Sequence, residues 1–133
     1  MEPFSPSLLP TITSVEVVVL RGIEPKRVDE FMVAAMNAPY VTVDGALANR
    51  IADLWRQLPP GDQARCQVPP YGLRFRKARK VICQASLCWE CNNVYGEMGG
   101  VAGHYEFDAA HSASQELLAE LQRVSKTAEG GTE

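Results

Sequence analysis

The strongest constraint on how this chain folds is a run of β-branched residues near its amino terminus. The segment SVEVVVLR, from Ser14 to Arg21, is rich in valine and contains neither glycine nor proline. β-Branched side chains restrict the backbone and pack well on a pleated sheet, so this run favours a strand. We predict a well-buried strand over 14–21 that ends at Gly22.

Two segments after this strand have the apolar spacing of helices. Pro25 suits the first turn of a helix, where its missing N–H is not needed, and apolar residues recur at helical spacing over 28–36. Asp44 is a favourable N-cap for a second helix, whose apolar stripe covers 47–58. Residues 40–43 are predicted to be a short extended linker between the two helices.

The pattern changes to that of strands in the second half of the chain. Apolar and basic residues alternate from Leu73, and the segment 80–95 is a long run that is mostly compatible with a strand. The glycine-rich segment 96–103 is predicted to be a flexible connection, and 104–108 to be a further strand. A capping-box sequence that starts at Ser112 predicts a final helix.

These segments together predict an α+β fold. We expect an antiparallel sheet of about four strands packed by three helices, in the order β-α-α-β-β-β-α. A length of 133 residues is most simply one domain. We expect residues 1–12 to form an extended N-terminal arm, 13–125 a single globular domain, and 126–133 a flexible C-terminal tail.

The amino-terminal residues do not have the pattern of a signal peptide. They lack a basic segment followed by a continuous apolar core, and no apolar run in the sequence is long enough to span a membrane. We therefore expect a cytoplasmic protein with no membrane partner. In a reducing compartment, an even number of cysteines does not indicate disulfides.

Four cysteines lie close together in the sequence: Cys66, Cys83, Cys88 and Cys91. Cys88 and Cys91 have the spacing of a zinc knuckle, and with Cys66 they are the candidate metal ligands. The same spacing occurs in redox-active thiol pairs. A third interpretation makes the cysteines part of the core, because a continuous strand over 81–95 would place Cys88 and Cys91 on opposite faces. The residues alone leave the three interpretations open.

Two segments around these cysteines resemble a pattern in small uncharacterised bacterial proteins. Residues 65–75 (RCQVPPYGLRF) contain Cys-x-x-Pro followed by Gly-Leu-Arg, and residues 86–93 (SLCWECNN) contain Cys-aromatic-Glu-Cys. The resemblance covers about a quarter of the chain. It implies that Cys66, Cys88 and Cys91 belong to one structural unit that excludes Cys83. No activity is assigned to that group, although bacterial proteins of this size and character are often toxin-neutralising immunity proteins.

A dense group of basic residues lies between the predicted strands: Arg74, Arg76, Lys77, Arg79 and Lys80. With Glu97 in the glycine-rich segment, they are the predicted partner-binding residues. The net charge of −3 gives no overall attraction to nucleic acid, and one aromatic residue among the cations is too few for a base-stacking surface. An acidic protein partner is therefore favoured over nucleic acid, while the same cations also suit a solvated hairpin tip.

Alternate residues of the predicted strand over 104–108 carry titratable side chains. His104, Glu106 and Asp108 would lie on one face, where they suit acid–base chemistry or the solvent-exposed face of a strand. We predict no catalytic residue and no cofactor. The expected function is that of a non-enzymatic bacterial protein-binding protein, an immunity protein that neutralises a cognate toxin by direct binding. The alternative is a cysteine-dependent structural zinc or thiol-regulatory protein.

Overall fold

A computed structural model describes residues 2–3, 5–20, 38–61, 71–89 and 93–128 of the chain. Within them, a seven-stranded sheet is combined with two α-helices and one short 3-10 helix. The strands are β1 (Glu2–Pro3), β2 (Ser14–Val19), β3 (Tyr40–Asp44), β4 (Tyr71–Lys77), β5 (Lys80–Cys88), β6 (Asn93–Met98) and β7 (Val101–Glu106). The helices are η1 (Pro6–Leu8), α2 (Gly45–Arg56) and α3 (Ser112–Ala128).

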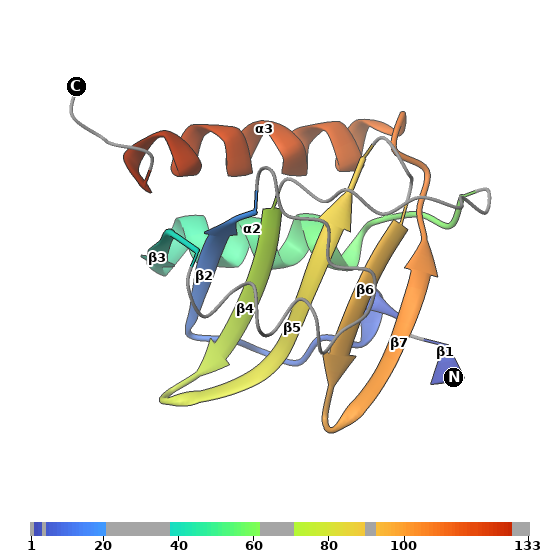
Figure 1. Cartoon of the computed structure of the whole chain (residues 1–133), viewed down its shortest axis with the longest axis horizontal. Coiled ribbons are helices and arrows are strands. Elements are labelled where there is room, and N and C mark those ends of the chain that lie inside the picture. The colour runs from blue at the N-terminus through green and yellow to red at the C-terminus, as the bar shows by residue number, and fades with distance from the viewer. Residues whose placement is uncertain (1, 4, 21–37, 62–70, 90–92, 129–133) are drawn as a thin grey trace.

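The strands follow the order β1-β7-β6-β5-β4-β2-β3 across the sheet. Strands β4 to β7 form an antiparallel meander, and β2 continues the sheet by pairing with β4 on one side and β3 on the other. The one parallel pairing joins β1 to β7 and places Glu2 opposite Gly103. Figure 1 shows α2 and α3 on the same side of this sheet.

The core lies between the two helices and one face of the sheet. Val15 is opposite Phe75 in the β2–β4 register, and the Phe75 ring packs against Trp55 of α2 with centroids 5.3 Å apart. On the same strand, the Tyr71 hydroxyl is 3.2 Å from the hydroxyl of Ser125 in α3. Alternate residues of a strand share a face, so both helices cover one face of the sheet. Burying each large apolar side chain there contributes about 1.5–3 kcal/mol.

Several predicted elements are confirmed. The strand predicted over 14–21 is β2. It is buried on both faces: Val15 and Val17 on the core face and Val18 on the face away from α2 and α3 are all inaccessible to solvent. The second and third predicted helices are α2 and α3. The first predicted helix, over 28–36, lies outside the described residues.

The predicted sheet of about four strands packed by three helices is wrong, and so is the predicted element order. The described sheet has seven strands, and α2 and α3 are the two α-helices in the described ranges. One reason is that 40–44 forms strand β3 instead of a linker. Val41 and Val43 pair with Val17 and Val15 of β2. So short a strand cannot be recognised in the sequence until its partner strand is known.

The segment 80–95, predicted to be one long strand, contains two strands. Between β5 and β6 the chain reverses, and Leu87 becomes the cross-strand neighbour of Val94 while Cys88 becomes the neighbour of Asn93. The predicted alternation therefore fails after the reversal, since Val94 and not Asn93 shares a face with Leu87. Apolar residues on both sides of the reversal conceal it in the sequence.

The glycine-rich segment 96–103 is a tight hairpin and not a flexible connection. Gly99 and Gly100 form its turn with φ angles of 62° and 84°, which is the conformation that a two-residue hairpin turn requires. Gly96 and Gly103 face each other in the β6–β7 register. The glycines therefore belong to paired strands and to the turn that joins them.

The described residues before β2 contact the globular part of the chain. Leu9 and Ile12 are buried in the hydrophobic core, and the Arg56 side chain donates hydrogen bonds to the carbonyls of Leu9 and Pro10 at 2.9 and 2.7 Å. At the other end, α3 continues through residues 126–128. No helix in the described ranges has both the length and the apolar character needed to cross a membrane.

Candidate functional site

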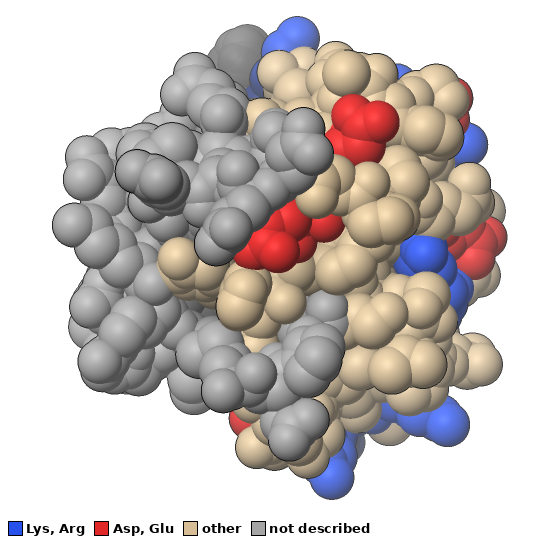
Figure 2. Space-filling model, turned by 90° about the vertical axis from the view of Figure 1, so that its right-hand side faces the viewer, with Lys and Arg blue, Asp and Glu red and all other residues tan. Residues whose placement is uncertain are grey.

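The basic residues predicted to bind a partner lie at the β4–β5 hairpin. Its turn consists of Ala78 and Arg79, and Lys77, Arg79 and Lys80 are all exposed there. In Figure 1 the β4–β5 hairpin turns at the lower end of the molecule, and Figure 2 shows some of the Lys and Arg side chains at that end. We call Lys77, Arg79 and Lys80 the basic tip.

Hydrogen bonds from the segment before β2 hold the basic tip in one conformation. The Ala78 N–H donates to Thr13 Oγ1 at 2.8 Å, and the Thr13 N–H donates to the Arg76 carbonyl at 2.8 Å. Across the turn, Arg76 Nη1 donates to the Arg79 carbonyl at 3.0 Å. An ordered turn loses less conformational entropy when it binds a partner, so the exposed cations are presented in a favourable way for binding.

The other two basic residues of this segment have an internal partner. Glu16 of β2 accepts hydrogen bonds from Arg74 Nε and, at 2.8 Å, from Arg76 Nε. The side chains of Glu16, Arg74 and Arg76 are 10%, 15% and 30% exposed. Burial by itself raises the pKa of Glu16, but the hydrogen bonds and positive charges of Arg76 and Arg74 outweigh it and hold that pKa below its ordinary value. Glu16 therefore stays ionised and neutralises much of their charge.

Glu97 lies in strand β6 and not in a loop. It is opposite Gln84 of β5, whose Nε2 is 3.3 Å from Glu97 Oε1. Registers across the sheet place Glu16, Arg74, Gln84 and Glu97 in one row on the face opposite α2 and α3. Glu97 thus lies in the same row as Arg74, with strand β5 between their two strands. It does not lie at the turn that carries the basic tip.

The cysteines are placed only in part by the described residues. Cys66 and Cys91 lie outside them, and Cys88 is fully buried at the end of β5. Cys83 is buried on the core face, and this burial, with a smaller effect of the Glu97 charge, raises the pKa of its thiol to about 12. Cys83 is therefore an unreactive core residue at neutral pH. The described part of the chain contains no group of three or more His, Cys, Asp and Glu suited to a metal ion.

The predicted acid–base residues do not form one group. His104 and Glu106 share a face of β7, with Nε2 and Oε2 3.3 Å apart. Asp108 follows the strand, and its carboxylate accepts a hydrogen bond from the Ala110 N–H while its carbonyl accepts one from the Ser114 hydroxyl. Asp108 thus stabilises the turn before α3, whereas His104 and Glu106 lie on the face of the sheet opposite α2 and α3.

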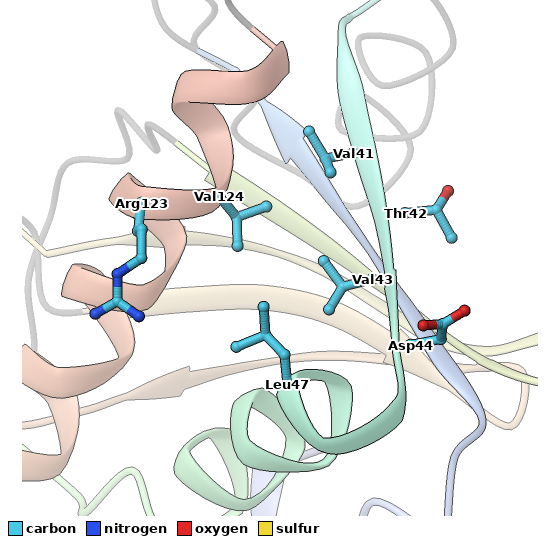
Figure 3. A pocket seen from close by; sticks show the side chains of 7 residues that line it. All are labelled: Val41, Thr42, Val43, Asp44, Leu47, Arg123 and Val124. Carbon is cyan, nitrogen blue, oxygen red and sulfur yellow. The ribbon is translucent and has the colours of Figure 1, made fainter. Parts of the chain in front are cut away.

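A groove at the β3 edge was not predicted from the sequence. It has a volume of about 420 Å³ and is open to solvent between β3, the start of α2 and the end of α3. Figure 3 shows Val41, Val43 and Leu47 pointing into it, with Arg123 and Val124 of α3 on the far side. The two valines of 40–43 are the available signal, but the sequence predicts an extended linker there, with Asp44 as the N-cap of the next helix.

Comparisons with known proteins give no relative for this chain. No protein-family model matches it, and neither a curated protein nor a solved structure does.

Proposed function

We propose that this chain is a protein-binding protein that uses the basic tip to contact an acidic surface of its partner. The observation that carries the proposal is the hydrogen bond from the Ala78 N–H to Thr13 Oγ1, which fixes the turn while Lys77, Arg79 and Lys80 remain exposed. Complementary charges at such a surface accelerate association and select the partner. The specific form that we propose is a bacterial immunity protein that neutralises a toxin by direct one-to-one binding.

The ion pairs of Glu16 decide which residues serve as contacts. Arg74 and Arg76 already share the Glu16 carboxylate, so a partner that recruited them would have to compete with hydrogen bonds inside the sheet. The basic tip has no such competition among the described residues. Arg74 and Arg76 therefore support the hairpin, and the three residues of the basic tip supply the charge for binding.

The experiment compares partner capture by three versions of the full chain: wild type, Arg79→Glu and Lys126→Glu. Arg79 and Lys126 are both exposed, and each reversal changes the net charge equally. We expect Arg79→Glu to weaken the complex with a captured protein by about tenfold or more, and Lys126→Glu to leave it almost unchanged. The affinity of the wild type should also fall as salt concentration rises.

The toxin-neutralising form has its own test. The captured partner, expressed alone in bacteria, should inhibit growth, and co-expression of the wild-type chain should restore it. Co-expression of Arg79→Glu should restore growth less well. A partner that binds wild type and Arg79→Glu equally would remove the basic tip from the interface, and a harmless partner would contradict the immunity function.

A further inference from the structure

Among the residues that the structure describes, strand β3 is an edge of the sheet. It is the last strand in the sheet order, and in the described part of the chain it pairs with β2 alone. Tyr40 is 52% exposed, and Thr42 and Asp44 are exposed as well. At the opposite edge, β1 has only two residues and one of them is Pro3. Very short edge strands, proline and lysine discourage association between sheets, whereas β3 has five residues and contains neither proline nor lysine.

The backbone of β3 directs hydrogen-bonding groups outward at alternate positions. The Val19 N–H donates to the Pro39 carbonyl at 2.9 Å, which makes these two residues a hydrogen-bonded pair of the β2–β3 ladder. Hydrogen-bonded pairs alternate along antiparallel strands, so the next pairs toward α2 involve Val41 and Val43. The residues between them have their backbone groups on the open side: Tyr40, Thr42 and Asp44.

We propose that two copies of this chain associate by antiparallel pairing of their β3 strands, centred on Thr42. In this arrangement Thr42 faces Thr42 of the second copy, and Tyr40 faces Asp44. The N–H groups of Thr42 and Asp44 donate, and the carbonyls of Thr42 and Tyr40 accept. The outward groups are symmetric about Thr42, so the same surface serves both copies, as a two-fold interface requires.

The side chains on the helix side of β3 favour this pairing. Val41 and Val43 point into the groove that Leu47 and Val124 also line (Figure 3). The proposed register brings Val41 of one copy beside Val43 of the other at a pair without backbone hydrogen bonds, where side chains approach most closely. The groove of each copy would therefore be closed by apolar side chains of the other, which removes apolar surface from water.

Charge complementarity on the opposite face favours a second copy over another occupant. The register places Asp44 of one copy opposite Tyr40 of the other. The guanidinium carbon of Arg74 lies 5.1 Å from the centroid of the Tyr40 ring. Glu16 balances only one of the two positive charges of Arg74 and Arg76, so a net positive charge remains beside Tyr40 while the hydrogen bonds to Glu16 stay in place. Within the described residues the Asp44 side chain makes no capping hydrogen bond to α2, so its carboxylate can approach this charge without breaking one.

The first test measures the mass of the full chain in solution by light scattering and sedimentation. We expect wild type to form a dimer at high micromolar concentration. Thr42→Lys would place like charges opposite each other at the centre of the interface and should raise the dissociation constant by about tenfold or more. Ala102→Lys is the matched control, because Ala102 is exposed on β7 and its substitution adds the same charge away from β3. Circular dichroism checks that each variant is folded.

The second test addresses the register. Thr42→Cys places two thiols opposite each other at the symmetry centre, where diamide should oxidise them to an intermolecular disulfide, while Ala102→Cys should cross-link no more than wild type. A wild-type chain that stays monomeric up to millimolar concentration would overturn the proposal. It would also be overturned by a dimer that Thr42→Lys leaves intact, or by equal cross-linking of the two cysteine variants.

Discussion

Glu16 Oε2 accepts a hydrogen bond from Arg76 Nε at 2.8 Å, although 60 residues separate the two in the chain. The same carboxylate also binds Arg74, so one buried acid serves two arginines of β4. This arrangement joins β2 to β4 through side chains as well as through the backbone. It also explains why the segment around the β4–β5 hairpin is less basic in the folded protein than in the sequence.

Replacement of Glu16 by glutamine should destabilise the protein. The change leaves Arg74 and Arg76 without a counter-charge on a face where both are largely buried, and we expect a loss of about 1–3 kcal/mol in the free energy of unfolding. Urea unfolding followed by circular dichroism measures it. Glu97→Gln is the control, because Glu97 is close to Gln84 and to no cation among the contacts described, and it should change stability by less than about 0.5 kcal/mol.

The contribution of Glu16 should depend on pH in one direction. Its pKa in the folded chain lies below the ordinary value of 4.5, so the folded state favours the ionised form. The stabilisation is complete above pH 4.5 and is lost as pH falls through the folded-state pKa. We expect the stability difference between wild type and Glu16→Gln to be largest near pH 7 and to shrink in acid. A difference that is constant down to pH 2 would contradict this.

Two residues with left-handed backbone conformation should respond to substitution in opposite ways. Ala78 has φ = 56° and Gly45 has φ = 64°. Only glycine adopts this region without a steric cost from Cβ, so Ala78→Gly should stabilise the protein and Gly45→Ala should destabilise it, each by about 1 kcal/mol. The midpoint of denaturant unfolding reports both changes. If Ala78→Gly lowers the midpoint, backbone strain at the hairpin is not relieved by glycine.

The contact between α2 and α3 should depend on one buried carboxylate. Glu120 of α3 binds Arg50 of α2 at 2.7 Å and Arg123 at 2.8 Å, and its side chain is 6% exposed. Glu116 also approaches Arg50, but at 3.4 Å and with 53% exposure. Because both arginines are at least half exposed and keep their hydration, we expect Glu120→Gln to cost only about 1 kcal/mol, and Glu116→Gln less than about 0.5 kcal/mol, in thermal or urea unfolding. Equal effects would show that burial of the Glu120 carboxylate adds nothing.

Cys83 should be unreactive in the native protein. Its thiol is buried and has a pKa of about 12, so almost no thiolate forms at pH 8. Iodoacetamide labelling followed by peptide mass spectrometry should leave Cys83 unmodified until denaturant is added. Rapid native labelling at Cys83 would show that the core opens there. Metal content of the purified chain tests the zinc prediction for Cys66, Cys88 and Cys91, and labelling at Cys88 and Cys91 tests the thiol-pair prediction.

The sequence predicts best those elements whose signals lie within one segment. Strand β2 follows from its valines, and α2 and α3 follow from apolar spacing with a suitable first residue. The strand at 40–44 was missed because five residues are too few to show a period. The reversal between Leu87 and Val94 was missed because both flanks are apolar, so the pattern continues while the chain turns back.

The sequence predicts the basic residues of the candidate site but not the ion pairs that two of them form. The cations of 74–80 were recognised from their density in the sequence. Nothing near Arg74 and Arg76 in the chain indicates that Glu16 binds both, since that contact depends on which strands become neighbours and in what register. The groove at β3 was missed for the same reason, because its walls come from segments that lie far apart in the chain.

The sheet order has a consequence for how the chain reaches its native state. Strands β4 to β7 follow one another closely, whereas Val15 of β2 meets Phe75 of β4 only after a much longer loop has closed. Closing a long loop costs more chain entropy and slows folding. We therefore expect the meander to assemble first and β2 to join it late. Glu16 would then arrive at a β4 strand whose two arginines are already in place.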